Sequence, residues 1–113
     1  MRRVRSRMRL NAGRKIEKSP AARARSHAWK SLLVARAIEN QCYVIGVNRT
    51  GTSPDGIDYA GDSVVIDPIG EVIASFPSSL PGITAVNIEK GIVEKYRRSL
   101  PALDDADDFT INL

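Results

Sequence analysis

The sequence predicts an α/β fold, and it predicts that this chain holds only part of one. Three patterns carry the prediction: a helical apolar period over residues 26–41, an unbroken apolar run over residues 42–47, and a hairpin signature over residues 63–76. The apolar run lacks polar alternation, which is typical of a strand covered on both faces. Because only one long helix is available to cover the sheet, we expect its other face to be left for a missing layer or a partner chain.

The first expected element is a helix over residues 26–41. Ser26 has a side chain suited to the N-cap, and Trp29, Leu33 and Ala37 follow at helical spacing. The apolar strand over residues 42–47 comes directly after this helix. We therefore expect the helix to pack on the sheet that contains this strand.

A loop and a hairpin are expected next. Residues 49–62 are rich in Gly, Ser, Thr, Pro and Asp, which predicts a long loop. In the following hairpin, Pro68 presets φ for the first central turn position and Gly70 accepts a left-handed conformation. These two residues predict a tight reversal between strands over residues 63–66 and 71–76.

The remaining elements are a strand over residues 83–88 and a short helix over residues 89–98, which Pro101 ends. The acidic stretch 104–108 lacks the Gly-punctuated pattern of a calcium loop, so we expect it to be solvated. Residues 109–113 form a short tail.

Length and composition exclude several classes of protein. With 113 residues, the chain is long enough for one small domain at most. No apolar run approaches the roughly 20 residues that span a bilayer, so we expect no membrane contact. One Cys and one His cannot form an internal disulfide or a typical zinc site. No metal site is predicted.

The net charge of +4 averages two unlike pieces. Residues 1–30 carry 11 Lys and Arg against one acid, whereas residues 31–113 carry 6 basic and 12 acidic residues. We therefore divide the chain into a basic head, residues 1–24, and a body, residues 25–113. The head is poor in apolar residues and is predicted to be disordered.

Three alternatives remain open for the basic head: a tail without function or a mis-started reading frame, a polyanion-binding segment, and a targeting segment. It contains no aromatic residue on which bases could stack, so a nucleic-acid partner is not favoured. It also lacks the apolar region of a secretory signal, and we expect a cytoplasmic protein.

The body carries three ordered motifs: WKSLLVARAIENQ at residues 29–41, YVIGVNRTG at residues 43–51 and YAGDSVVIDPIGE at residues 59–71. Together they resemble the C-terminal portion of the nitrilase (carbon-nitrogen hydrolase) superfamily. The similarity is to its omega-amidase-like branch and includes the ending at residues 96–107. It implies an αββα sandwich, here incomplete, and an assembly that is a homo-oligomer in the family.

The resemblance also implies hydrolysis of small non-peptide amides without a metal or an organic cofactor. In the family a Cys attacks the amide carbon, a Glu acts as general base and a Lys stabilises the oxyanion. These residues lie upstream of the helix that contains Trp29, and this chain has no Cys there. We therefore assign no catalytic residue and expect the chain to be inactive alone. Docking on a full-length relative as a non-catalytic module is the alternative.

Four residues are candidate site residues by resemblance. Asn48 and Arg49 follow a strand end, where open α/β sheets place ligand contacts, and are predicted to form the rim of the substrate pocket. Arg36 and Glu39, three apart on one helix face, are predicted to support the site from behind. Cys42 opens an apolar strand after a helix, so we interpret it as a structural residue and not as the nucleophile.

Overall fold

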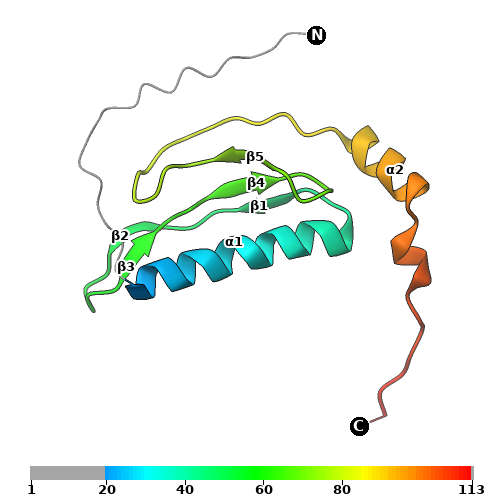
Figure 1. Ribbon diagram of the computed structural model, residues 1–113, viewed down its shortest axis with the longest axis horizontal. Helices are drawn as coiled ribbons and strands as arrows, with labels where there is room; N and C mark the ends of the chain where they lie inside the picture. The colour runs from blue at the N-terminus through cyan, green and yellow to red at the C-terminus, as the bar shows by residue number, and fades with distance from the viewer. Residues whose placement is uncertain (1–19, 113) are drawn as a thin grey trace.

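The computed structural model describes residues 20–112, which form one long helix against a small sheet and a C-terminal arm (Figure 1). The elements in chain order are α1 (Pro20–Asn40), β1 (Val44–Gly46), β2 (Thr50–Thr52), β3 (Asp58–Ala60), β4 (Val64–Ile66), β5 (Val72–Ser75), α2 (Lys90–Ser99) and the 3₁₀ helix η1 (Ala102–Asp105). This mixture of helix and sheet confirms the predicted α/β class. Most of the basic head, residues 1–19, lies outside the described residues, and so do the expectations for it.

Helix α1 begins earlier than the sequence interpretation placed it. The expected start at Ser26 is wrong, because the helix already begins at Pro20, a residue that the first helical turn tolerates well. Residues 20–24, which composition assigns to the basic head, are therefore helical. Ser26 lies within α1 and not at its N-cap, and its hydroxyl donates a hydrogen bond to the carboxylate of Asp62.

The C-terminal end of α1 is closed by two backbone hydrogen bonds. Gln41 adopts a left-handed φ of 46°, its N–H bonds to the carbonyl of Ile38, and the N–H of Cys42 bonds to the carbonyl of Ala37. This is the Schellman pattern, which turns the chain sharply out of the helix. It sends the chain directly into β1.

The central sheet has three antiparallel strands in the order β1-β4-β5. Helix α1 packs on one of its faces, where Ala37, Val64 and Ile66 form the buried core. Gly46 lies under the helix, and a Cβ added there would come within 2.4 Å of Leu33. The lack of a side chain at Gly46 thus lets the helix approach the sheet closely.

The hairpin predicted from Pro68 and Gly70 is confirmed as β4 and β5. Gly70 has a φ of 93°, and its N–H bonds to the carbonyl of Asp67 at 3.0 Å. The side chain of Asp67 also accepts hydrogen bonds from the N–H groups of Ile69 and Glu71. Local turn chemistry therefore accounts for this reversal without help from distant residues.

Two sequence expectations need correction. The segment 49–62 is not a plain loop, because β2 and β3 pair within it as a second, two-stranded antiparallel sheet. The strand expected over residues 83–88 does not form within residues 20–112, where this segment belongs to no sheet. The strand expected over residues 42–47 does form, but β1 covers only its centre, Val44–Gly46.

The C-terminal arm is held to the end of α1. The helix expected over residues 89–98 is confirmed as α2, shifted by one residue. Arg97 of α2 donates hydrogen bonds to the carbonyls of Gln41 and Asn40, at 3.1 and 3.0 Å. The side-chain amide of Gln41 in turn donates to the carbonyl of Leu100 at 2.8 Å. The positive charge of Arg97 is also stabilised by the negative end of the α1 helix dipole.

The second face of the central sheet is open, as the sequence predicts. On β1 and just after it, Ile45 and Val47 point away from α1 and are 60% and 78% exposed. A strand of this apolar composition is normally covered on both faces. Within residues 20–112 only one layer covers the sheet.

The helices of this part of the chain were also compared with the length and hydropathy of a membrane span. None of them is long and apolar enough to cross a membrane.

Candidate functional site

A cavity of about 570 Å³ lies against the open face, where β1 ends and β4 begins. Its walls come from these two strands, from β5 and from residues 80–88. Asn48 and Arg49, the predicted rim residues, both line it. Their role in binding a substrate stays a prediction, but the structure does bring both residues to this cavity.

Asn48 is held by the strand next to it. The hydroxyl of Ser63 accepts a hydrogen bond from the N–H of Asn48 at 3.0 Å and donates one to its carbonyl at 3.3 Å. The amide oxygen of Asn48 accepts from the N–H of Arg49 at 2.9 Å. The pairing of β1 with β4 is thus extended by side chains, and the backbone at the cavity edge is fixed.

Arg49 lies over an aromatic ring from the neighbouring hairpin. Its guanidinium carbon is 4.5 Å from the centroid of the Tyr59 ring, which is the geometry of a cation–π contact. The Arg49 side chain is mostly exposed. The sequence analysis did not predict sheet β2-β3. Through Tyr59, this sheet orients the guanidinium of Arg49 beside the cavity.

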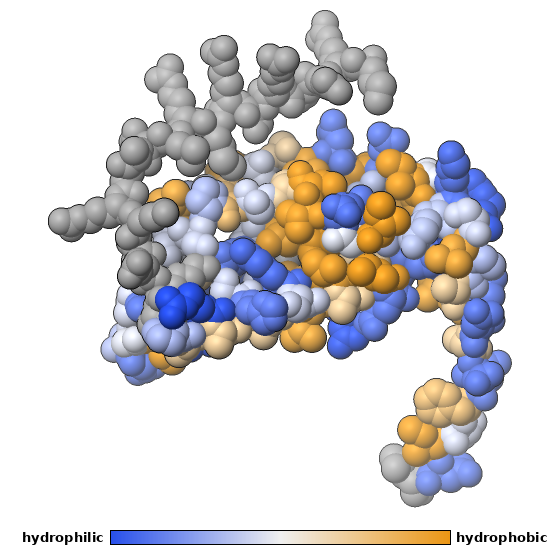
Figure 2. Space-filling model, viewed as in Figure 1, coloured by the Kyte–Doolittle hydropathy of each residue, from blue (hydrophilic) through white to orange (hydrophobic). Residues whose placement is uncertain are grey.

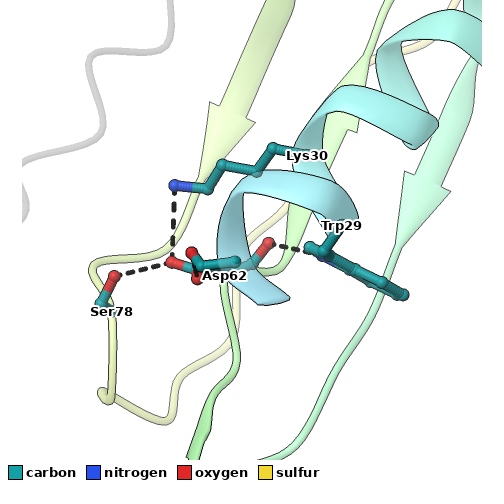
Figure 3. A network of polar contacts seen from close by, with 5 residues as sticks. Trp29, Lys30, Asp62 and Ser78 are labelled. Carbon is teal, nitrogen blue, oxygen red and sulfur yellow. Dashed lines mark hydrogen bonds and ion pairs between the residues drawn. The ribbon is translucent and has the colours of Figure 1, made fainter. Parts of the chain in front are cut away.

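Asp62 is the centre of a buried polar network (Figure 3). Its side chain is 1% exposed and accepts hydrogen bonds from the hydroxyls of Ser26 and Ser78, the latter at 2.6 Å. The ammonium of Lys30 lies 3.5 Å from the same carboxylate, and the indole N–H of Trp29 donates to the backbone carbonyl of Asp62. Buried charges are stable only with such partners. Asp62 therefore ties α1 to the loop at residues 77–79.

This network fixes the position of the cavity edge with respect to α1. Asp62 directly precedes Ser63, which holds Asn48, and Gly61 before it has a φ of 71°. The sequence interpretation placed Asp62 at the end of a long loop, and it did not foresee the contacts with α1. Ser26 and Asp62 are 36 positions apart, and no local sequence pattern reports a contact over that distance.

Arg36 and Glu39 pair with each other on the exposed side of α1, where their side chains are 67% and 51% exposed. Neither is among the described residues that line the cavity. The structure therefore does not bring this pair together with Asn48 and Arg49, and a supporting role for it stays a prediction.

Cys42 is half-buried at the end of α1, and it too is absent from the described residues that line the cavity. Its backbone N–H closes the helix by bonding to the carbonyl of Ala37. This position agrees with a structural role for Cys42. Within residues 20–112, no three His, Cys, Asp or Glu side chains gather in a way that could hold a metal ion.

Comparison with protein families matches the chain to carbon-nitrogen hydrolase over residues 8–98. The matched range includes part of the basic head, so the boundary near residue 24 stays a prediction.

Among curated proteins, the chain is 44% identical over 87 residues to omega-amidase YafV of Escherichia coli K12, covering 77% of the chain and 34% of that protein. It is 47% identical over 77 residues to 2-oxoglutaramate amidase of Bacillus subtilis, covering 68% of the chain and 29% of that protein. The chain thus spans about a third of the length of these relatives.

Solved structures show the same partial overlap. The model superposes with a TM-score of 0.73 and 39% identity on XC1258 from Xanthomonas campestris, a CN-hydrolase superfamily protein, covering 79% of this chain and 33% of that one. A second structure, the carbon-nitrogen hydrolase of Helicobacter pylori, gives a TM-score of 0.71 at 27% identity and is also covered to 33%. The described fold therefore corresponds to about one third of each of these two chains.

Proposed function

The chain belongs to the carbon-nitrogen hydrolase family, and from this premise we propose that the enzyme to which this segment corresponds hydrolyses small non-peptide amides to a carboxylic acid and ammonia. The observation that carries the proposal is the match over residues 8–98 together with the cavity that Asn48 and Arg49 line. Relatives named omega-amidase and 2-oxoglutaramate amidase support an omega-amide as the substrate. The proposal includes a homo-oligomeric assembly in the cytoplasm.

The chemistry of the proposed reaction divides between this segment and the part of the fold that it lacks. By family resemblance, a Cys thiolate attacks the amide carbon, the carbon-nitrogen bond breaks, and water then releases the acid from the thioester. A Glu moves the protons and a Lys stabilises the oxyanion. All three lie upstream of the α1 helix in the family, and residues 1–28 contain no Cys. The chain by itself is therefore proposed to be inactive.

The segment contributes the pocket edge. The amide oxygen of Asn48 accepts a hydrogen bond from the N–H of Arg49, and Tyr59 lies against the guanidinium of Arg49, so both side chains are positioned before a substrate arrives. Positioning of this kind lowers the entropy cost of binding. Arg49 is the one cationic side chain among the residues of 20–112 that line the cavity, and it favours a substrate with a negative charge at the end away from the amide.

A chimera tests the proposal. Residues 25–113 replace the aligned portion of the E. coli omega-amidase, and ammonia release from small omega-amides is measured. We expect a turnover rate within about tenfold of that of the parent enzyme. A tenfold loss corresponds to about 1.4 kcal/mol less transition-state stabilisation.

The role of Arg49 is tested in the same chimera. Arg49→Ala is expected to raise KM about tenfold while kcat changes less. Arg98→Ala, an exposed Arg on α2, is the matched control. A folded chimera without ammonia release would contradict the proposal.

The 113-residue chain is assayed in parallel, and we expect no ammonia release. Turnover that Cys42→Ala abolishes would show that this thiol is a nucleophile after all, and would overturn both its structural interpretation and the proposed inactivity.

A non-catalytic interaction module is the second candidate, and the exposed side chains of Ile45 and Val47 favour it. It predicts a stable hetero-oligomer with an intact relative in size-exclusion chromatography. Elution of the chain only as a monomer or an aggregate in that mixture would count against this candidate.

Polyanion binding through the basic head is a separate hypothesis, which is tested by deleting residues 1–24. Binding to nucleic acid that survives the deletion would reject it.

A further inference from the structure

The large cavity offers a ligand a single positive charge. Arg49 and Asp62 are the only ionisable residues that line it within residues 20–112. The carboxylate of Asp62 already binds the hydroxyls of Ser26 and Ser78 and the ammonium of Lys30. Figure 2 shows hydrophobic residues gathered at the surface over the strands of the sheet, so charge is scarce around the cavity. Arg49 is therefore the group that an anionic ligand meets there.

The guanidinium of Arg49 has no acid partner within residues 20–112. In this part of the chain it makes no hydrogen bond and no ion pair, and its one described contact is with the ring of Tyr59. Asp58, next to Tyr59 on β3, accepts a hydrogen bond from the hydroxyl of Thr52 at 2.7 Å instead. The N–H donors of Arg49 are thus available to a carboxylate, the partner with which a guanidinium forms its strongest hydrogen bonds.

Tyr59 belongs to a hairpin that is held on both sides of it. The carbonyl of Asp58 accepts a hydrogen bond from the guanidinium of Arg25 at 3.1 Å, and the carbonyl of Ala60 accepts one from the N–H of Ser79 at 2.8 Å. Tyr59 is absent from the described lining of the large cavity and lines a second cavity, of about 210 Å³, against α1. Its ring therefore acts on a ligand in the large cavity only through Arg49.

From these contacts we infer that Tyr59 is a positioning residue for substrate recognition: its ring holds the guanidinium of Arg49 at the cavity edge, where the guanidinium binds a carboxylate of the substrate. Both contacts form together, because an aromatic ring covers the face of a guanidinium and leaves the N–H donors in its plane. Without the ring, the Arg49 side chain loses rotamer freedom when the substrate binds, which weakens binding.

The inference rests on the proposed function, and it adds the residue that makes the site select an anionic amide over a neutral one. Selectivity of this kind is a difference between two affinities, so it is measured with two ligands that differ only in charge. A change in the fold alone would weaken both ligands. Loss of the Tyr59 ring is expected to weaken only the anionic one.

The experiment titrates the 113-residue chain with two amides that have the same number of carbon atoms. Succinamate carries a carboxylate, and butanamide has a methyl group in its place. Nuclear magnetic resonance follows the side-chain Nε–Hε signal of Arg49, and sodium chloride holds the ionic strength constant. We expect a saturable shift with succinamate and at least about tenfold weaker binding of butanamide. Equal binding of the two amides, or no saturable shift with succinamate, would overturn the inference.

Variants at Tyr59 test the ring. Tyr59→Leu is expected to raise the Kd for succinamate about threefold, the effect of an exposed cation–π contact, and to leave that for butanamide unchanged. Tyr59→Phe keeps the ring and is expected to bind succinamate as the original chain does. Tyr96→Leu is the matched control, because Tyr96 is equally half-buried but belongs to α2. Unchanged affinity in Tyr59→Leu, or an equal loss in Tyr59→Phe, would contradict the inference.

A double variant tests whether Tyr59 acts through Arg49. Arg49→Gln is expected to raise the Kd for succinamate at least about tenfold. Adding Tyr59→Leu to Arg49→Gln is expected to cause no further loss, and an additional threefold loss would refute the coupling. Circular dichroism checks that each variant folds, and Tyr59→Thr, which suits a strand, replaces Tyr59→Leu if that variant does not. These readouts need no turnover, so selective binding without ammonia release in the chimera would count against the proposed function only.

Discussion

Removing the Asp62 carboxylate is expected to destabilise the fold more than any exposed carboxylate would. The side chain is 1% exposed and accepts hydrogen bonds from Ser26 on α1 and from Ser78 in the loop that follows β5. In Asp62→Ala, both hydroxyls lose a charged acceptor, although Ser78 is exposed and water can replace part of its contact. Asp62 also has a left-handed φ of 55°, which Ala adopts less readily than Asp or Asn.

The expected magnitude follows from the number of contacts. A hydrogen bond to a charged group contributes about 1.5–3 kcal/mol, so the two hydroxyl contacts together account for about 3–6 kcal/mol. The ammonium of Lys30 is 52% exposed and is solvated when its partner is removed, so it adds less than about 1 kcal/mol. Asp62→Asn keeps one acceptor oxygen and tolerates the left-handed backbone. We expect it to lose about half as much.

Urea unfolding followed by far-UV circular dichroism measures the free energy of unfolding of each variant. Asp55→Ala, at an exposed loop position, is the matched control and is expected to stay within about 0.5 kcal/mol of the original chain. The reasoning is refuted if Asp62→Ala loses no more stability than Asp55→Ala. It is also refuted if Asp62→Asn is as destabilised as Asp62→Ala, because the retained acceptor would then contribute nothing.

The remaining predictions concern glycines. Gly46→Ala is expected to cost about 1–3 kcal/mol of unfolding free energy, because the new methyl group lies 2.4 Å from Leu33 and must displace it; an unchanged urea midpoint would contradict this. Gly51 and Gly70 share a φ of 93°, but only an added Cβ at Gly70 meets Ile38, at 2.8 Å. Gly51→Ala should cost about 1–2 kcal/mol of backbone strain. Gly70→Ala should cost about 1–3 kcal/mol more unfolding free energy than Gly51→Ala, because of the contact with Ile38. Equal losses of unfolding free energy in the two variants would refute this packing contribution.

Local turn and helix chemistry made part of the fold predictable. The β4-β5 reversal depends on Pro68 and Gly70, which act within four residues, and the end of α2 follows from Pro101 just after it. The motif that contains Asn48 and Arg49 placed both at a strand end, and the structure places them at the cavity. These features need no information from distant parts of the chain.

Other elements were missed for identifiable reasons. Composition assigned residues 20–24 to the basic head, although their Ala and Arg are good helix formers that simply extend α1. Residues 49–62 were predicted as a loop because Gly and Pro have low strand propensity. The pairing of β2 with β3 stabilises two strands there despite that low propensity. Residues 83–88 have strand composition without a strand, because a strand needs a neighbour.

The sequence by itself indicated the family and placed Asn48 and Arg49 at a strand end, because both depend on short motifs and local periods. Only the tertiary structure decided that Asp62 binds Ser26 across 36 positions, that Tyr59 supports Arg49, and that Ile45 is left uncovered. The physical reason is that side-chain contacts and burial depend on how distant segments pack, whereas turns and helix ends depend on neighbours along the chain.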